Sequence, residues 1–186
     1  DIFRDENKFK PLPYSRNEVE EISTLFNQSN YNTVSYMVSD ASEKNFRTQK
    51  LNKIVHIASH AIYDKSSFES SGIFLSPINI EPNNTSYLND GFISMRELYN
   101  MTIKSNLVVL SACNTGNGKQ QEGEGSLGLP RGFIIAGVPN VIASLWKVHD
   151  EKTKDLMVAF YKHLLEDKVS YAEALRLAKL DCIEKG

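Results

Sequence analysis

The fold of this chain is decided by the stretch LVVLSACNTG, residues 107–116. It opens with an apolar, β-branched run that is too short for a free-standing helix, and it ends abruptly in small and polar residues. This pattern predicts a buried strand with a thiol, Cys113, at its carboxyl end. Ligands of open α/β sheets bind beyond the carboxyl ends of parallel strands, so we expect Cys113 to face a substrate.

A second stretch of the same kind lies upstream. KIVHIASH, residues 53–60, is again apolar and β-branched, and it ends in a histidine that leads into the irregular segment 61–64. If the two strands are parallel neighbours, their carboxyl ends present His60 and Cys113 at one edge of the sheet.

These two side chains are the minimum equipment for acyl transfer. A thiol near pH 7 is only a few per cent thiolate, and a neighbouring histidine lowers its pKa and later protonates the leaving amine. His60 precedes Cys113 by about 50 residues, and the cysteine stands among small residues with a glycine shortly after it, which is the caspase order.

At these residues the sequence resembles the CHAT family, caspase-like cysteine peptidase domains that are related to separases and caspases and usually follow tetratricopeptide repeats. The resemblance implies a three-layer caspase-like fold, with Cys113 as nucleophile and His60 as its acid/base partner. It extends over motifs at residues 56–60, 71–72, 75, 90–91, 107–116, 123–125, 127–128, 136–137, 143–146, 150, 157, 160–161 and 174–175.

Two positions depart from the family pattern. Ala61 stands where glycine usually follows the catalytic histidine, and Asn114 stands where an acidic residue usually follows the cysteine. Ala61 keeps its backbone N–H, so we expect it to form an oxyanion hole with the N–H of Cys113.

Length and composition indicate one ordinary globular domain. The chain has 186 residues, of which 41% are hydrophobic and 24% charged. We assign residues 1–13 to a linker or the tail of a missing upstream part and residues 14–186 to the caspase-like domain, which we expect to be a fragment of a longer polypeptide. The resemblance implies a tetratricopeptide-like repeat region in the same polypeptide.

The charge distribution argues against direct binding of nucleic acid or an anionic membrane. The net charge is −2, the pI is near 6.1, and Lys and Arg are scattered without a basic stripe. No apolar stretch approaches the length of a transmembrane helix. Two cysteines are too few for a disulfide framework, and the reactive position of one favours a reducing compartment, so we expect a cytoplasmic protein.

The pattern along the chain predicts an α/β fold with a mostly parallel sheet flanked by helices. Strands are expected at Tyr31 to Val38 and Asn140 to Leu145, in addition to the two already described. Residues 63–92 read as a β-hairpin insertion around the turn-rich Pro82-Asn83-Asn84, which would lie beside His60.

Helices are expected to begin at short capping motifs. We assign these to Ser15 with Glu18, Asp40 with Glu43, Ser94 with Glu97, Asp150, and Ser170 with Glu173, and a small-residue helix to about 126–135.

Neither a cofactor nor a metal is expected. Residues 123–128 satisfy G-x-G-x-x-G, with Asp150 further on, but about ten polar residues separate the glycines from the preceding strand, and Glu122 and Glu124 would repel a pyrophosphate. These glycines are better suited to a loop that orders beside the nucleophile. His149 and His163 lack a third ligand at sensible spacing for zinc.

Substrate preference is predicted from the residue two before the cysteine, which in caspase-like relatives often contacts the side chain preceding the cut. Here it is Ser111, which is small and neutral, and it favours an uncharged residue there. Asp64, Glu124 and Asp150 are the acidic groups that would instead favour a basic residue.

The sequence therefore predicts a cysteine endopeptidase that cleaves protein or peptide substrates through a Cys-His dyad and is switched on by an upstream sensor or partner. The alternative is a catalytically inactive caspase-like scaffold or interaction module, which the changes at Ala61 and Asn114 would suit.

Overall fold

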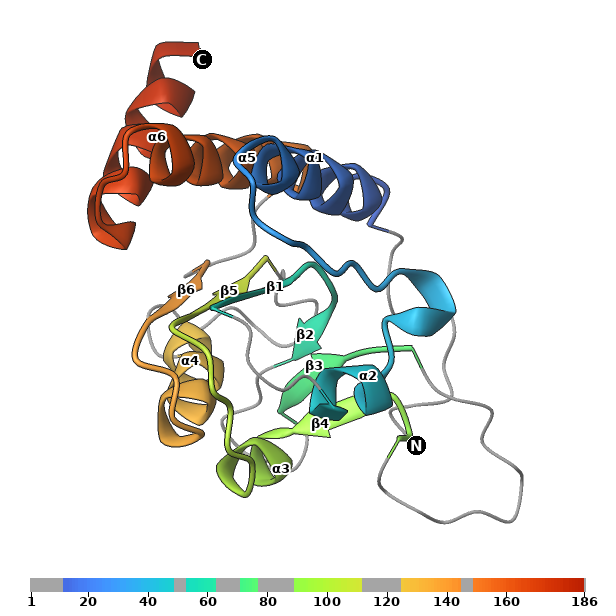
Figure 1. Cartoon of the computed structure of the whole chain (residues 1–186). Coiled ribbons are helices and arrows are strands. Elements are labelled where there is room, and N and C mark those ends of the chain that lie inside the picture. Colours follow the sequence, from blue (N-terminus) through green and yellow to red (C-terminus); the bar gives the residue numbers. More distant parts are fainter. Residues whose placement is uncertain are drawn as a thin grey trace. The chain divides into compact units, whose positions relative to one another are not determined.

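A computed structural model describes residues 12–48, 53–62, 71–76, 89–111, 125–144 and 149–185. The chain divides into two compact units (Figure 1). The first, which we call the sheet unit, takes in Tyr36–Lys147 together with Asp1–Pro11. The second, the helical unit, takes in Leu12–Ser35 and Val148–Gly186.

The sheet unit is built on a parallel sheet of three strands. These are β1 (Ile54–Ile57), β5 (Leu107–Leu110) and β6 (Val141–Ala143), in the order β1-β5-β6. The four residues of β5 are all buried. Burial on both faces explains why this strand is a continuous apolar run without polar alternation.

One face of this sheet packs against α3 (Met95–Tyr99) and α4 (Gly125–Ile135). Ile57 and Leu110 share a core with Leu98 and Phe133 on that face. α4 ends in a Schellman motif, in which the Val138 N–H donates to the Phe133 carbonyl at 3.0 Å and Gly137 adopts a φ of +102°. Glycine suits that left-handed position, and the turn returns the chain to β6.

The antiparallel strands of the predicted hairpin insertion are confirmed, and its turn at Pro82-Asn83-Asn84 lies outside the described residues. β2 (Ala61–Ile62), β3 (Gly72–Phe74) and β4 (Phe92–Ser94) form an antiparallel sheet in that order. Ser94 then caps α3 in the predicted capping box: the Glu97 N–H donates to Ser94 Oγ at 3.2 Å, and the Ser94 N–H donates to Glu97 Oε2 at 2.8 Å.

The short helix that precedes β1 is present but starts differently from the prediction. α2 spans Glu43–Thr48, and Asp40 belongs instead to a 3₁₀ turn, η1 (Val38–Asp40). Ser42 caps α2, since its Oγ accepts a hydrogen bond from the Asn45 N–H at 3.3 Å. The hydroxyl adjacent to the helix reaches its N–H groups, whereas the Asp40 backbone is already committed to the preceding turn.

The strand predicted at Tyr31 to Val38 is wrong. Residues 31–37 form no regular structure, and η1 begins at Val38. Val34 is 69% exposed and Val38 68% exposed. Side chains within the segment bond to α1 instead of to a strand: Ser35 Oγ lies 2.7 Å from Ser23 Oγ, and the Thr33 hydroxyl donates to Asn27 Oδ1 at 3.1 Å. A β-rich pattern without a paired neighbour does not form a ladder.

The helical unit consists of α1 (Ser15–Gln28), α5 (Asp150–Glu166) and α6 (Tyr171–Lys185). Figure 1 shows α1 and α5 running side by side. Phe26 of α1 meets Tyr161 of α5 edge to face, with 5.3 Å between ring centroids. Tyr161 is fully buried, so this aromatic contact forms the centre of the unit.

Two of the three N-caps predicted for the helices of the helical unit are wrong. α1 is capped by Tyr14 without a side-chain bond, and Ser15 Oγ donates to the Leu12 carbonyl at 2.8 Å. His149 is the N-cap of α5, and Asp150 is its first helical residue. The third is confirmed, because the Glu173 N–H donates to Ser170 Oγ at 3.3 Å.

The fold is therefore mixed α/β with a parallel sheet and flanking helices, as predicted, and it is consistent with a caspase-like fold. None of the helices in the described part of the chain is both long and apolar enough to cross a membrane.

Candidate active site

The two strands predicted to carry the catalytic pair are parallel neighbours. β1 pairs with β5 in the register Ile54↔Leu107 to Ile57↔Leu110, and the Ser111 N–H continues the ladder by donating to the Ile57 carbonyl at 2.9 Å. His60 lies three residues past Ile57, and Cys113 lies two residues past Ser111 in the sequence. The carboxyl ends of both strands thus meet at one edge. Cys113 itself is outside the described residues.

His60 occupies the junction between the two sheets. It follows β1 and immediately precedes β2, its side chain is half-buried, and its Nδ1 atom is buried. Its carbonyl accepts a hydrogen bond from the Phe74 N–H at 2.9 Å, which ties its backbone to β3. The hairpin insertion therefore holds the histidine in place from one side.

The backbone of Ala61 follows from this bond. Antiparallel pairs alternate between hydrogen-bonded and non-hydrogen-bonded. Because His60 and Phe74 are hydrogen-bonded, the next pair, Ala61↔Ile73, is of the other kind. The Ala61 N–H is therefore directed away from β3.

The parallel sheet presents two different faces near this edge. Ile57, Leu110 and Ala143 are in register across β1, β5 and β6 and contribute to the core with α3 and α4. Successive residues of a strand point to opposite faces. The next row, Ala58, Ser111 and Ser144, therefore belongs to the other face.

The remaining predicted site residues are not brought together by the described structure. Asp64 and Glu124, like Cys113, lie outside the described residues. Asp150 belongs to the helical unit, where its Oδ2 accepts a hydrogen bond from the Tyr14 N–H at 2.9 Å. The roles assigned to these three acidic residues stay predictions.

An ionic network beside the hairpin was missed by the sequence analysis. Arg47 of α2 donates to Glu43 Oε1 and to Glu97 Oε1, both at 2.7 Å, and the Asn89 N–H donates to Glu43 Oε2 at 2.8 Å. The spacing of Glu43 and Arg47, one helical turn apart, was the available clue. The network joins α2 to α3 and to the turn before β4.

Burial dominates the electrostatics of this network. The Glu43 side chain is fully buried, and burial raises its pKa although the Arg47 guanidinium acts in the opposite direction. Burial likewise raises the pKa of Asp90, whose carboxylate accepts a hydrogen bond from the Phe92 N–H at 2.8 Å.

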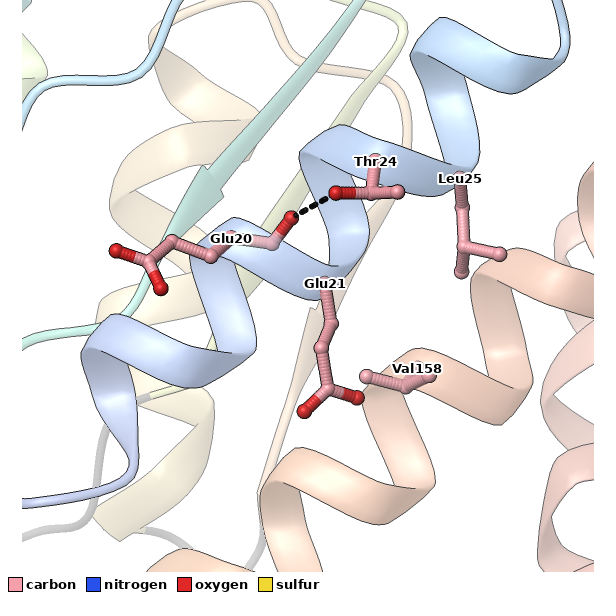
Figure 2. Close-up of a pocket in the computed structure, with 5 residues that line it drawn as sticks. All are labelled: Glu20, Glu21, Thr24, Leu25 and Val158. Carbon is pink, nitrogen blue, oxygen red and sulfur yellow. Dashed lines mark hydrogen bonds between the residues drawn. The ribbon is translucent and has the colours of Figure 1, made fainter.

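A shallow pocket of about 330 Å³ lies in the helical unit, and it holds none of the predicted site residues. Figure 2 shows Glu20, Glu21, Thr24 and Leu25 of α1 and Val158 of α5 around it. The Thr24 hydroxyl donates to the Glu20 carbonyl at 2.8 Å, so it is engaged within α1. Within the ranges described, no three His, Cys, Asp or Glu side chains are grouped to hold a metal ion.

The parallel sheet with its flanking helices, and the histidine that follows β1 beside β5, are consistent with a caspase-like fold. The model of the CHAT domain family matches residues 3–186, so the chain belongs to this family of caspase-like, peptidase-related domains. No curated protein and no solved structure matches the chain.

Proposed function

We propose that this domain is a cysteine endopeptidase that uses Cys113 and His60 as a dyad. The observation that carries the proposal is the hydrogen bond from the Ser111 N–H to the Ile57 carbonyl, 2.9 Å long, which joins the strands leading to the two residues. Membership of the CHAT family supports the same chemistry.

The reaction begins with attack of the Cys113 thiolate on a peptide carbonyl. The oxyanion that forms accepts hydrogen bonds from the backbone N–H groups of Cys113 and Ala61. His60, which carries the proton taken from the thiol, donates it to the leaving amine as the C–N bond breaks. Water then attacks the thioester, the carboxylic acid leaves, and the thiol regains its proton.

The direction of the Ala61 N–H supports its part in this scheme, because it points away from the β2–β3 ladder. Removing one oxyanion donor typically slows catalysis by about 10²–10³-fold. A small displacement of the β2 backbone would therefore silence the enzyme, which fits a domain that an upstream sensor or partner switches on.

The test is cleavage of a diverse peptide library, with sites identified by mass spectrometry. Cys113→Ala and His60→Ala are expected to abolish cleavage. Cys182→Ala in α6 and His149→Ala before α5 are matched controls that remove the same side chains elsewhere, and both are expected to cleave like the parent.

If the parent cleaves nothing, even within its longer polypeptide and with candidate activators, the proposal fails and an inactive scaffold takes its place. Cleavage that survives in Cys113→Ala would equally overturn the assigned dyad.

A further inference from the structure

A row of small residues crosses the parallel sheet just short of the candidate catalytic pair. Ser111 directly follows β5, Ser144 directly follows β6, and Ala58 directly follows β1. His60 and Cys113 each stand two residues beyond this row in the sequence. The row thus lies next to the site at which a scissile bond would be held.

The two hydroxyl-bearing residues of the row are neighbours on one face. β5 and β6 are in register from Val108↔Val141 to Leu110↔Ala143, so Ser111 and Ser144 are the next pair. Adjacent strands are about 4.8 Å apart, which brings the two serines within reach of a single ligand side chain.

Burial varies along this face of the sheet. Val109, two residues before Ser111 on the same face, is completely buried. Ser111, Ala58 and Ser144 are half-buried. The three residues of the row thus keep part of their surface exposed, as do His56 and Ile142 beside Val109 in the row before it.

We infer that Ser144, together with Ser111, contacts the substrate side chain that precedes the cut and selects an uncharged, hydrogen-bonding residue such as Asn or Gln. This inference rests on the proposed peptidase function. A serine hydroxyl both donates and accepts, which matches the donor and acceptor of a carboxamide.

The same row disfavours a charged residue. None of its three side chains carries a charge that could neutralise Lys, Arg or Asp, and an unpaired charge is costly to withdraw from water.

The inference is tested with peptides that differ only at the residue before the cut, which is Gln, Asn, Leu, Lys or Asp. The parent is expected to prefer Gln and Asn. Ser144→Asp places a carboxylate in the row, and we expect it to raise kcat/KM for Lys relative to Gln at least tenfold. Ser144→Ala removes one hydroxyl at nearly the same size, and its preference for Gln over Leu should fall roughly tenfold.

The matched control is Asn140→Asp, which adds the same charge at the amino end of β6, where Asn140 Nδ2 donates to the Asn106 carbonyl at 2.9 Å. It is expected to keep the preference of the parent. Circular dichroism checks that each variant is folded. If Ser144→Asp is not folded, Ser144→Ala alone decides the test.

The outcomes separate the two proposals. If the parent cleaves but Ser144→Asp and Ser144→Ala keep its preference, the role of Ser144 is overturned and the peptidase function stands. A parent that prefers Lys or Asp also overturns it. If the parent cleaves no peptide, both proposals fall together.

Discussion

Gly72 is the residue on which the hairpin beside His60 depends. It stands in β3 opposite Ser94 of β4. A Cβ atom here would lie 2.6 Å from Cζ of Phe92 and would also collide with the Ile93 carbonyl oxygen. The close approach of β4 therefore requires glycine for space, and β3 in turn bonds the His60 carbonyl through Phe74.

Gly72→Ala is expected to destabilise the protein by about 2 kcal/mol, in the range of overpacked cores, because backbone and a packed ring must move. Urea unfolding at neutral pH measures the effect. The control is Gly132→Ala in α4, whose Cβ would meet Sδ of Met95 at 3.1 Å and Cδ1 of Leu98 at 3.2 Å. These flexible ends can yield, and alanine favours the helix by up to about 1 kcal/mol, so we expect little net change. Equal losses in both variants would contradict this account.

Single residues also show where sequence patterns stop being informative. The pattern S-x-x-E predicted a capping box correctly at Ser94 and wrongly at Ser15. Glu97 is partly exposed, and its carboxylate accepts the Ser94 N–H while it also binds Arg47, whereas Glu18 is 1% exposed within the helical unit. Burial, with the Glu18 carboxylate second, raises the pKa of Tyr161 well above its ordinary value. Burial in the folded protein decides which glutamate can cap its helix, and the spacing of residues in the sequence carries no information about that burial.

At the scale of elements, the strands next to the site were predictable because both of their faces are buried. All four residues of β5 are buried, and its continuous apolar run is typical of a strand that is covered on both faces. The segment at residues 31–38 has a similar β-rich composition, yet Tyr31 is 51% exposed there. Whether a β-rich segment is a strand depends on a neighbour to pair with, which its own sequence does not reveal.

The ionic network that joins α2 to α3 is centred on a buried carboxylate. Its central Arg47 side chain is 25% exposed and its partner Glu43 is 0% exposed. Removing the arginine leaves a buried carboxylate without its cation. Arg47→Met is therefore expected to cost about 3 kcal/mol at pH 7.5, as for other broken buried pairs.

The pH dependence of this loss identifies its cause. Burial already raises the pKa of Glu43, and losing Arg47 removes an interaction that lowers it, so Glu43 takes up a proton more readily in the folded variant. A group whose pKa is raised by folding stabilises the folded state at low pH, and this contribution is lost as the pH rises. The cost measured by urea unfolding should thus shrink between pH 7.5 and pH 5. The control, Arg16→Met, breaks only an exposed pair with Glu20 at 3.7 Å and should change stability by less than about 0.5 kcal/mol. A cost independent of pH would point to lost packing instead.

For the whole molecule, the fold class and the family were predictable because the family motifs are spread over residues 56–175, and the family model matches residues 3–186. The division of the chain into two units was not predictable from the sequence. The helical unit combines two segments far apart in the sequence, and the bond between Tyr14 and Asp150 spans 136 residues. Helical periodicity shows that a face is apolar, but it does not show which distant helix will cover it.

The same unit contains a histidine that couples its stability to pH. His163 of α5 lies between two carboxylates: Nδ1 is 2.6 Å from Asp167 Oδ2, and Nε2 is 3.0 Å from Asp181 Oδ2 of α6. Ionised carboxylates only accept hydrogen bonds, so both contacts are satisfied together when the ring carries two protons. The hydrogen bond to Asp167, with Asp181 adding to it, raises the pKa of His163 above its ordinary value.

This raised pKa sets the sign of the effect. The imidazolium stabilises the fold fully below the unfolded pKa of about 6.5, and the contribution is lost as pH rises through the folded pKa. His163→Gln is therefore expected to cost about 0.5–1 kcal/mol at pH 6, the scale of a partly exposed ion pair, and clearly less at pH 9. Urea unfolding of parent and variant at both pH values measures the difference. His149→Gln serves as the control, because His149 is exposed and makes no side-chain cap to α5, so its cost should be small. If His163→Gln costs the same at pH 9 as at pH 6, the bridge from α5 to α6 does not depend on the charged imidazole.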